Sequence, residues 1–410
     1  MAKQKPFRVC MLVHQNYYLD ARVIQYTEGL VLSGISVDIV CVPEKGAHHP
    51  RSDERIRVYS IPVKRMHGGL ISLLAEYVLS LFFYSIWLIV LHLRNRYQVI
   101  HVHNMPDFLV FAALIPRLLG ARLILDIHDP TPEFYQSKYR EREEHILISL
   151  LKLQERLSIA LAHHVVTANP HFKDNLVSRG IPAEKITVIT NQPDPRVFDR
   201  AAFLAERQKV HDRFTLIYPG TIAPRYGLDV AIRAVPELVK YIPELRLLII
   251  GPLSDHAVEL MQLADTLGVS DYVEFRHPIP LEEVPHQMAL ADAGIYPALP
   301  DPHMSIAIPG KVLEYAVMGL PIVASRLQIL EELFPDESTL FFEPGNVEQF
   351  TACVLRLYRA PALRSELVAR ADRVLAESQS WERERERYLA LIRQLIKYDG
   401  DFRKGEQGYG

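Results

Sequence analysis

A regular alternation of short apolar runs and helical patterns constrains the fold of this chain more than any other feature. In the first half, runs typical of strands occupy residues 8–13, 37–42, 57–63, 99–102, 122–127, 164–167 and 186–189. The alternation restarts with runs at 214–218, 245–250, 272–275, 293–296, 322–324 and 339–342. Strands separated by helices predict parallel sheets covered by helices on both faces. The sequence therefore predicts an α/β protein made of two Rossmann-like, doubly wound domains.

The length of the chain and one polar segment place the boundary between these domains. A chain of 410 residues is long enough for two domains, each with a core of its own. The segment 191–213 is polar and contains Pro193 and Pro195, which is typical of a linker. We therefore predict an N-terminal domain over residues 1–200 and a C-terminal domain over residues 210–379. Within the first domain, helices are expected at 108–119 and 141–162.

The composition argues against several classes of protein. The formal net charge is -3, whereas a general nucleic-acid-binding domain is usually strongly basic. The three cysteines, Cys10, Cys41 and Cys353, are too few and too scattered for a disulfide framework or a structural zinc site. The N-terminal residues show no long apolar run with a cleavage site, so we expect no signal peptide and a cytoplasmic location.

Residues 70–93 form one long apolar segment whose role stays open. The segment carries only Glu76 as a formal charge, and its length approaches that of a membrane span. Lys64 and Arg65 precede it, and Arg94 and Arg96 follow it. It is a buried helix of the α/β domain, a helix resting in a membrane interface, or a membrane span. The α/β pattern continues on both sides, which disfavours a span.

Polar side chains follow several strands of the first half. His14 follows the first strand, His103 and Asn104 follow the fourth, and Asp126-Ile127-His128-Asp129 closes the fifth. A polar side chain at the end of an apolar strand needs a partner or a function, and ligands of doubly wound folds bind at these ends. His128 lies between two aspartates, and a carboxylate can fix its tautomer and raise its basicity.

The first helix and the loop after residue 129 add further candidates. Asp20 and Arg22 begin the first helix, where they form either a contact with a ligand or a local pair. Residues 130–133, Pro-Thr-Pro-Glu, predict a rigid loop at the rim of a ligand site. The pairs His48-His49 and His163-His164 lack the spacing of a metal site, and no G-x-S-x-G turn follows a strand. We therefore expect neither a metal centre nor a serine hydrolase.

The second half of the chain contains the elements of a nucleotide site. Gly220 and Thr221 follow strand 214–218, and a glycine there lets backbone amides approach a phosphate closely. Lys311 and Glu314 lie on a helix before strand 322–324. A carboxylate on such a helix can bind ribose hydroxyls, although an ordinary charged pair on a surface helix has the same spacing. Arg276 follows strand 272–275, where the backbone is placed to contact a base.

Taken together, these features resemble the retaining glycosyltransferases of the GT-B fold, specifically glycosyltransferase family 4. The resemblance covers nearly the whole chain and rests on the order and spacing of its motifs. These are 20–23 (DARV), 99–104 (VIHVHN), 126–129 (DIHD), 218–221 (YPGT), 282–285 (EEVP), 309–325 (PGKVLEYAVMGLPIVAS) and 380–382 (SWE). Residues 309–315 also show the P-x-K-x-x-E-Y pattern of a subset. The resemblance implies two Rossmann-like domains facing across a cleft, with a last helix, 380–400, that rejoins the N-terminal domain.

The resemblance assigns the donor, a nucleoside diphosphate sugar, to the C-terminal domain and the acceptor to the N-terminal domain. We expect donor binding by Gly220, Thr221, Arg276, Ser305, Ile306, Ala307 and Glu314, with Glu314 on the ribose hydroxyls. We expect catalytic roles for His128, Arg225 and Lys311, with His128 contacting the donor sugar. We expect acceptor binding by His14, Asp20, Arg22, His103 and Asn104. Members of the family need no metal and no further cofactor.

Two departures from the family pattern affect these expectations. Ile306 stands where the family often has a glutamate that binds sugar hydroxyls, so the backbone of residues 305–308 is expected to replace it. Thr221 and Tyr226 stand where the family often has an arginine and a lysine that clamp the diphosphate. We expect Arg225 and Lys311 to supply this charge, because a leaving diphosphate needs such stabilisation.

The sequence thus predicts a metal-independent retaining glycosyltransferase of cell-surface glycan synthesis, with a carbohydrate or lipid-linked acceptor and no nucleic-acid partner. A peripheral contact with the inner membrane surface through residues 70–93 accompanies this prediction. One alternative is a non-catalytic scaffold or binding protein of the same fold, which the missing glutamate and clamp cations motivate. The other is a sugar-nucleotide epimerase, for which the sequence offers no convincing set of acid and base carboxylates.

Overall fold

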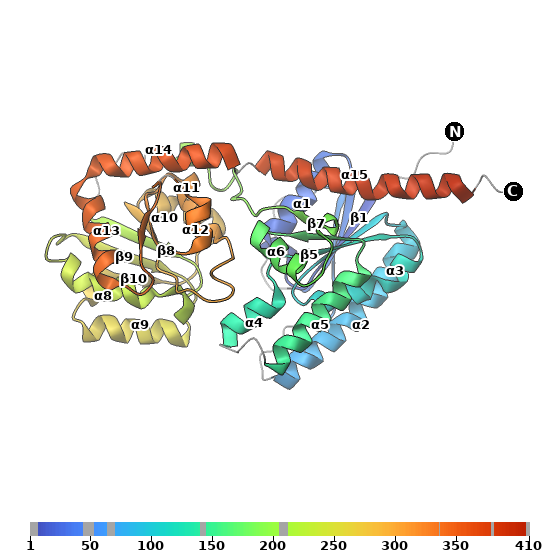
Figure 1. Cartoon of the computed structure of the whole chain (residues 1–410), viewed down its shortest axis with the longest axis horizontal. Helices are drawn as coiled ribbons and strands as arrows, with labels where there is room; N and C mark the ends of the chain where they lie inside the picture. Colours follow the sequence, from blue (N-terminus) through green and yellow to red (C-terminus); the bar gives the residue numbers. More distant parts are fainter. Residues whose placement is uncertain are drawn as a thin grey trace. The chain divides into compact units, whose positions relative to one another are not determined.

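The structure is a computed structural model that describes residues 7–43, 53–63, 70–139, 145–204, 212–335, 337–378 and 381–406 (Figure 1). The chain forms two compact units. The first comprises Met1–Asn191 together with Glu382–Gly410, and the second comprises Gln192–Trp381. The division after Asn191 lies at the start of the expected linker, nine residues before the predicted end of the first domain. Residues 205–211 of that linker lie outside the described residues.

The first unit contains a parallel sheet with the strand order β3-β2-β1-β4-β5-β6-β7. Its strands are β1 (Arg8–Val13), β2 (Ser36–Cys41), β3 (Ile56–Ser60), β4 (Val99–His103), β5 (Arg122–Ile127), β6 (His164–Thr167) and β7 (Ile186–Val188). The order reverses between β1 and β4, which pair from Val9 with Val99 to Leu12 with Val102. Such a switch point opens a crevice at the carboxyl ends of the strands, where ligands of doubly wound folds bind.

Helices cover both faces of this sheet, because successive side chains of a strand point to opposite sides. Along β1, Cys10 and Leu12 join the core under α2 (Leu70–Asn95), the 3-10 segment η2 (Asp107–Ala113) and α5 (Ile146–Leu161). Val9 and Met11 join the opposite core, under α1 (Ala21–Leu32) and α15 (Trp381–Glu406). The unit also contains η1 (Tyr17–Leu19), α3 (Leu114–Leu118), α4 (Thr131–Tyr139), α6 (Pro170–Ser178) and η3 (Ala183–Lys185).

The second unit contains a parallel sheet with the strand order β10-β9-β8-β11-β12-β13. Its strands are β8 (Phe214–Pro219), β9 (Leu245–Ile250), β10 (Val273–Arg276), β11 (Ala293–Tyr296), β12 (Ile322–Ser325) and β13 (Leu340–Phe342). Its helices are α8 (Leu228–Leu238), α9 (Asp255–Thr266), α10 (Val284–Ala289), α11 (Gly310–Val317), α12 (Gln328–Leu333), α13 (Val347–Arg359) and α14 (Pro361–Ser378), with short 3-10 turns η4 (Arg200–Phe203), η5 (Pro224–Tyr226), η6 (Ser270–Tyr272) and η7 (Leu281–Glu283). Both units thus have the predicted doubly wound architecture.

Three local predictions need correction. The expected rigid loop at 130–133 is instead the start of helix α4, where Pro132 is tolerated because first-turn amides have no partner within the helix. The expected helix 108–119 is divided into η2 and the short α3, and Pro116 lacks the amide that a continuous α-helix would use. The helix expected from residue 141 begins at Ile146, and residues 140–144 lie outside the described residues.

Candidate functional site

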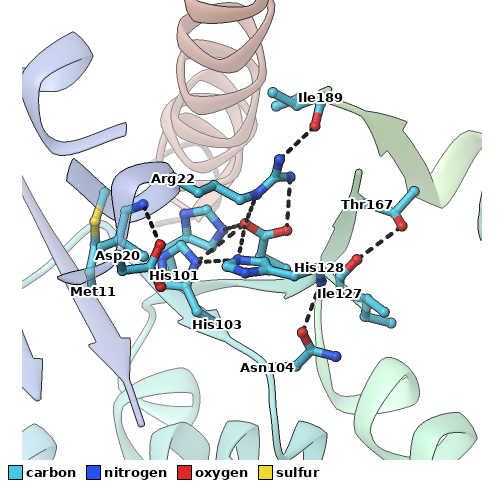
Figure 2. A network of polar contacts seen from close by, with 12 residues as sticks. Met11, Asp20, Arg22, His101, His103, Asn104, Ile127, His128, Thr167 and Ile189 are labelled. Atoms are coloured by element: carbon cyan, nitrogen blue, oxygen red, sulfur yellow. Dashed lines mark hydrogen bonds and ion pairs between the residues drawn. The ribbon is translucent and has the colours of Figure 1, made fainter. Parts of the chain in front are cut away.

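A buried network of polar side chains lies at the carboxyl ends of β4 and β5 in the first unit (Figure 2). Its centre is Asp126, whose side chain is fully buried. The Arg22 guanidinium donates from Nε to Oδ2 over 3.0 Å and from Nη2 to Oδ1 over 3.1 Å. This two-point pairing suits a planar guanidinium and a carboxylate, and it orients both groups. Asp20 caps α1 by accepting the N–H of Val23 over 3.1 Å.

Three histidines surround the same carboxylate. The Oδ2 atom of Asp126 lies 3.1 Å from His128 Nε2, 3.2 Å from His103 Nδ1 and 3.7 Å from His101 Nε2. The His128 side chain is 17% exposed, while that of His103 is 1% exposed and that of His101 is fully buried. Only His128 of these three therefore offers surface to a ligand, and the other two lie behind it.

The charges of this network follow from burial and from its ion pairs. Burial opposes the charged form of Asp126, but Arg22 and His128 outweigh it and hold the pKa of Asp126 well below its usual range. Burial also disfavours charge on His128, yet the Asp126 carboxylate raises the pKa of His128 above its ordinary value. Burial lowers the pKa values of His101 and His103. The arrangement therefore stabilises a cationic His128 beside neutral histidines.

Asn104 fixes the backbone that carries His128. Its Oδ1 accepts the N–H of His128 over 2.8 Å, and its Nδ2 donates to Asp107 Oδ1 over 2.9 Å and to the carbonyl of Asp129 over 2.7 Å. The side chain of Asn104 is thus engaged on both of its polar atoms. His14 lies elsewhere along the same sheet edge, with its Nε2 3.3 Å from the Glu76 carboxylate of α2.

The predicted acceptor-binding residues therefore have structural roles in this network. Arg22 and His103 support Asp126, Asp20 caps α1, and Asn104 holds the His128 loop. Their contact with an acceptor stays a prediction. His101 and Tyr388 were not predicted, although His101 lies on the same face of β4 as His103 because it is two residues away. Tyr388 lies on α15, and its Oη lies 3.0 Å from His101 Nδ1.

The second candidate site is a pocket of about 390 Å³ in the second unit. Its walls come from the ends of β8, β9 and β10 and from helix α11. Gly220 and Thr221 line one side, and Lys311 and Glu314, the two charged residues of its lining, stand on α11. A Cβ atom on Gly251 would lie 2.1 Å from the Gly220 carbonyl oxygen, so only glycine lets these two strand ends approach. The predicted nucleotide residues thus meet at one pocket.

Aromatic rings surround the ammonium group of Lys311. Its Nζ donates to Tyr218 Oη over 2.7 Å and lies 3.9 Å from the centroid of the Tyr218 ring, 4.6 Å from that of Tyr226 and 5.6 Å from that of Tyr296. Burial lowers the pKa of Lys311 to about 7, although Glu314 opposes the shift. Burial raises the pKa of Glu314 to about 7, against the opposing effect of Lys311. Both groups are therefore poised to change charge when a ligand enters.

Other predicted donor residues lie outside the lining of this pocket. Arg276 forms an ion pair with Glu274 over 2.5 Å and donates to Gln287 over 3.0 Å. The guanidinium of Arg225 lies 5.3 Å from the centroid of the Tyr226 ring.

The amides of the segment that follows β11 are already engaged in a turn. Ser305 donates its amide to the carbonyl of Asp301, and Ile306 and Ala307 donate theirs to His303. These three amides are thus occupied in this structure, and the binding roles of the segment stay predictions.

Two family models match the chain. The model of the glycosyl transferase 4-like domain matches residues 20–192, and that of glycosyl transferases group 1 matches residues 213–360. The chain belongs to glycosyltransferase family 4. The His128 network lies in the 4-like domain, and the Lys311–Glu314 pocket lies in the group 1 domain of this family 4 protein.

Similar proteins include lipid glycosyltransferases. Over 136 residues, 33% of this chain, it is 35% identical to a GDP-mannose-dependent alpha-(1-6)-phosphatidylinositol monomannoside mannosyltransferase of Mycolicibacterium smegmatis, of which the match spans 35%. It is 22% identical over 80% of its length to a human phosphatidylinositol N-acetylglucosaminyltransferase protein, of which the match spans 63%. The matched regions thus cover less than two thirds of either relative.

Solved structures share the fold of this family 4 protein. The sucrose-phosphate synthase of Thermosynechococcus elongatus superposes with a TM-score of 0.74 at 16% identity, over 96% of this chain and 100% of that one. Anabaena HepE in complex with UDP-glucose gives a TM-score of 0.68 at 15% identity, over 94% and 99% of the two chains. The fold is therefore that of the GT-B glycosyltransferases.

Proposed function

We propose that this protein transfers a sugar from a nucleoside diphosphate sugar to a hydroxyl of a lipid-linked or carbohydrate acceptor, in cell-surface glycan synthesis. The observation that carries the proposal is the pocket at the ends of β8 and β9, where Lys311 and Glu314 face two glycine-bearing strand ends. A nucleotide needs a carboxylate for its ribose and positive charge with amides for its phosphates. Membership of family 4 and lipid-directed relatives support the same reaction.

The described contacts divide the donor between a few groups. Glu314 binds the ribose hydroxyls, and Lys311 pairs with the diphosphate. The N–H of Gly220 already donates to the Ile250 carbonyl over 2.8 Å, so it is not the phosphate donor that the sequence suggested. The N–H of Thr221 has no acceptor among the described residues, which leaves it for a phosphate oxygen. These donors stabilise charge on the leaving diphosphate, so the reaction requires no metal ion.

His128 acts on the sugar end of the donor. Its raised pKa and its exposed edge let a cationic imidazole donate to a sugar hydroxyl while Asp126 fixes its orientation. The leaving diphosphate oxygen accepts the proton of the acceptor hydroxyl, so no separate protein base is needed. We further propose that the anomeric configuration of the sugar is retained.

The proposal is tested with purified protein, a panel of nucleoside diphosphate hexoses, and lipid-linked and free glycan acceptors. Mass spectrometry detects transfer, and NMR reads the anomeric configuration of the product. We expect transfer with retention, and we expect it to persist in EDTA. Donors that bind without transfer to any acceptor would favour the scaffold alternative, and sugar conversion without an acceptor would favour an epimerase.

Replacing His128 with alanine should lower the turnover number by about a hundredfold, as expected for loss of one preorganised donor near the reacting centre. Donor affinity should stay within about twofold, because the nucleotide pocket is built from other residues. Steady-state kinetics and calorimetric titration with the nucleoside diphosphate separate the two effects. His286→Ala, on the exposed surface of α10, is the control and should change neither value. Equal losses in turnover and affinity would contradict a role confined to the sugar.

The affinity for the donor should be greatest near pH 7 and fall on either side. On the alkaline side, Lys311 loses its proton as the pH rises through about 7, its lowered pKa. On the acid side, Glu314 becomes neutral as the pH falls through about 7, its raised pKa. Calorimetry with the intact sugar nucleotide measures this profile, because its phosphodiester groups do not titrate there. In Lys311→Arg the alkaline fall should disappear, since a guanidinium stays charged. An unchanged alkaline limb would show that another group is responsible.

A further inference from the structure

Helix α2 is anchored along one side and exposed along the other. The segment Ala75–Asn95 is long and apolar enough to cross a bilayer by length and composition, and 33% of its most apolar window is buried inside the molecule. Tyr84, Leu88 and Leu91 are buried against the sheet core. On the other side, Val78 is 68% exposed and Phe82 is 58% exposed. Because its inner side belongs to the folded core, α2 does not leave the sheet to span a membrane.

The exposed apolar surface continues onto neighbouring elements. The segment η2 contacts both α2 and α5, and α3 contacts α2. Figure 1 shows α2, α3 and α5 on the same side of the first unit. On α3, Leu114 is 40% exposed and Leu118 is 69% exposed, and on α5, Leu150 and Leu153 are more than half exposed. We call the exposed side of α2, η2, α3 and α5 the apolar face. Contiguous exposed apolar surface of this kind marks a site of interaction.

The charges of the four elements are sorted by sign. Their acidic residues, Glu76, Asp107 and Glu155, are 5%, 0% and 1% exposed. Their lysine and arginine residues reach the surface: Arg94 and Arg156 are exposed, and Arg117 and Lys152 are partly exposed. Burial lowers the pKa of His92, so it adds no charge at neutral pH. Among the described residues of these elements, the exposed charges are therefore all positive.

We propose that the apolar face docks in the plane of a bilayer that contains anionic phospholipids. Apolar side chains with basic residues and no exposed acid match the boundary between acyl chains and negative head groups. A second copy of this chain fits less well, because a two-fold interface would bring like basic residues together without acidic partners. The inference rests on the proposed function, since it names the surface at which a lipid-linked acceptor is met.

The contact between α2 and β1 connects this face to the ligand edge of the sheet. The Glu76 carboxylate, near the start of the described side chains of α2, lies 3.3 Å from His14 after β1. The carboxyl ends of β1 and β4 share one edge, and the His128 network lies at that edge. Docking through α2 therefore holds the edge that carries His128 near the lipid surface.

Vesicle co-sedimentation tests the proposal. The full chain is mixed with vesicles of phosphatidylcholine alone or of phosphatidylcholine with phosphatidylglycerol. We expect binding to the anionic vesicles and at least about tenfold weaker binding to the neutral ones, because each basic residue near an anionic surface contributes about 1 kcal/mol. Binding that does not depend on phosphatidylglycerol would overturn the role given to the basic residues.

Variants separate the apolar and the basic contributions. Phe82→Asp with Leu150→Asp, and Lys152→Glu with Arg156→Glu, should each lower binding to anionic vesicles by about tenfold or more. Val258→Asp on α9, a residue 49% exposed in the second unit, is the matched control and should bind as the parent does. Parental binding by both face variants would overturn the proposal. Sedimentation velocity without lipid is expected to show a monomer, and a dimer abolished by Phe82→Asp would assign the face to a second copy instead.

A soluble readout keeps this test separate from the proposed reaction. Calorimetric titration with nucleoside diphosphates should give the same affinity for the parent and for both face variants, because the pocket lies in the other unit. Binding of the nucleotide together with unchanged vesicle binding in the variants overturns the docking surface alone. Loss of nucleotide binding in the parent, with lipid-dependent sedimentation intact, overturns the proposed function alone.

Discussion

Replacing Glu314 with alanine should weaken binding of the nucleoside diphosphate by about a hundredfold or more. A hydrogen bond to a charged group contributes about 1.5–3 kcal/mol, and the ribose offers two hydroxyls to this carboxylate. Glu314 stands on α11 at the wall of the pocket, while the adjacent Leu313 and Tyr315 are buried in the core. The substitution therefore removes a ligand contact and leaves the packing side of the helix in place. Calorimetric titration of the variant against the parent measures the loss.

Glu237→Ala is the matched control for this prediction. Glu237 lies on α8 and forms an exposed ion pair with Lys240. Its removal should change neither the affinity for the nucleotide nor the melting temperature. If Glu314→Ala keeps the parental affinity while it folds normally, the ribose is not held by this carboxylate, and the assignment of the pocket fails.

Replacing Arg22 with methionine should lower the free energy of unfolding by about 3–5 kcal/mol, because it leaves a buried carboxylate without its partner. Arg22 donates twice to Asp126, and it also donates to the Ile189 carbonyl over 2.8 Å and to Asn191. Chemical denaturation followed by circular dichroism measures the change. Arg233→Met, in an exposed pair with Asp229 on α8, should leave the transition unchanged.

A double variant and the pH dependence test the cause of that loss. Arg22→Met combined with Asp126→Asn removes both charges and should recover part of the stability. The pKa of Asp126 is depressed, so its contribution is present above about 3.9, its unfolded value, and is lost as the pH falls through the folded value. The pKa of His128 is raised, so its contribution is full below about 6.5 and is lost as the pH rises through the folded value. If Arg22→Met unfolds like the parent across this range, the ion pair is not a source of stability.

The architecture could be predicted because it depends on local patterns. Apolar runs at regular spacing indicated the strands, and the polar residues after them indicated where ligands would bind. The pocket at Gly220, Lys311 and Glu314 was accessible for the same reason, since parallel strands bring their carboxyl ends to one edge. The helix α4 was missed because a proline pair suggests a loop, while a proline in a first turn costs a helix little.

Long-range contacts could not be predicted from the sequence. The approach of Tyr388 to His101 joins residues 287 positions apart, and no local pattern indicates it. Arg22 looked like a surface residue at a helix start, but the packing of α1 directs it to Asp126. The aromatic surroundings of Lys311 likewise depend on how η5 and the strands β8 and β11 meet α11. Each of these contacts depends on tertiary packing, which decides burial and therefore charge.

A thermal-shift screen across nucleoside diphosphates and their sugars tests the central claim most directly. A ligand that binds only the folded state at a hundred times its dissociation constant adds about 2.7 kcal/mol to stability. We expect one base series to raise the melting temperature of the parent and of Glu237→Ala, and to leave Glu314→Ala nearly unshifted. No shift with any of these compounds, or an equal shift in Glu314→Ala, would contradict a nucleotide-sugar site at Lys311 and Glu314.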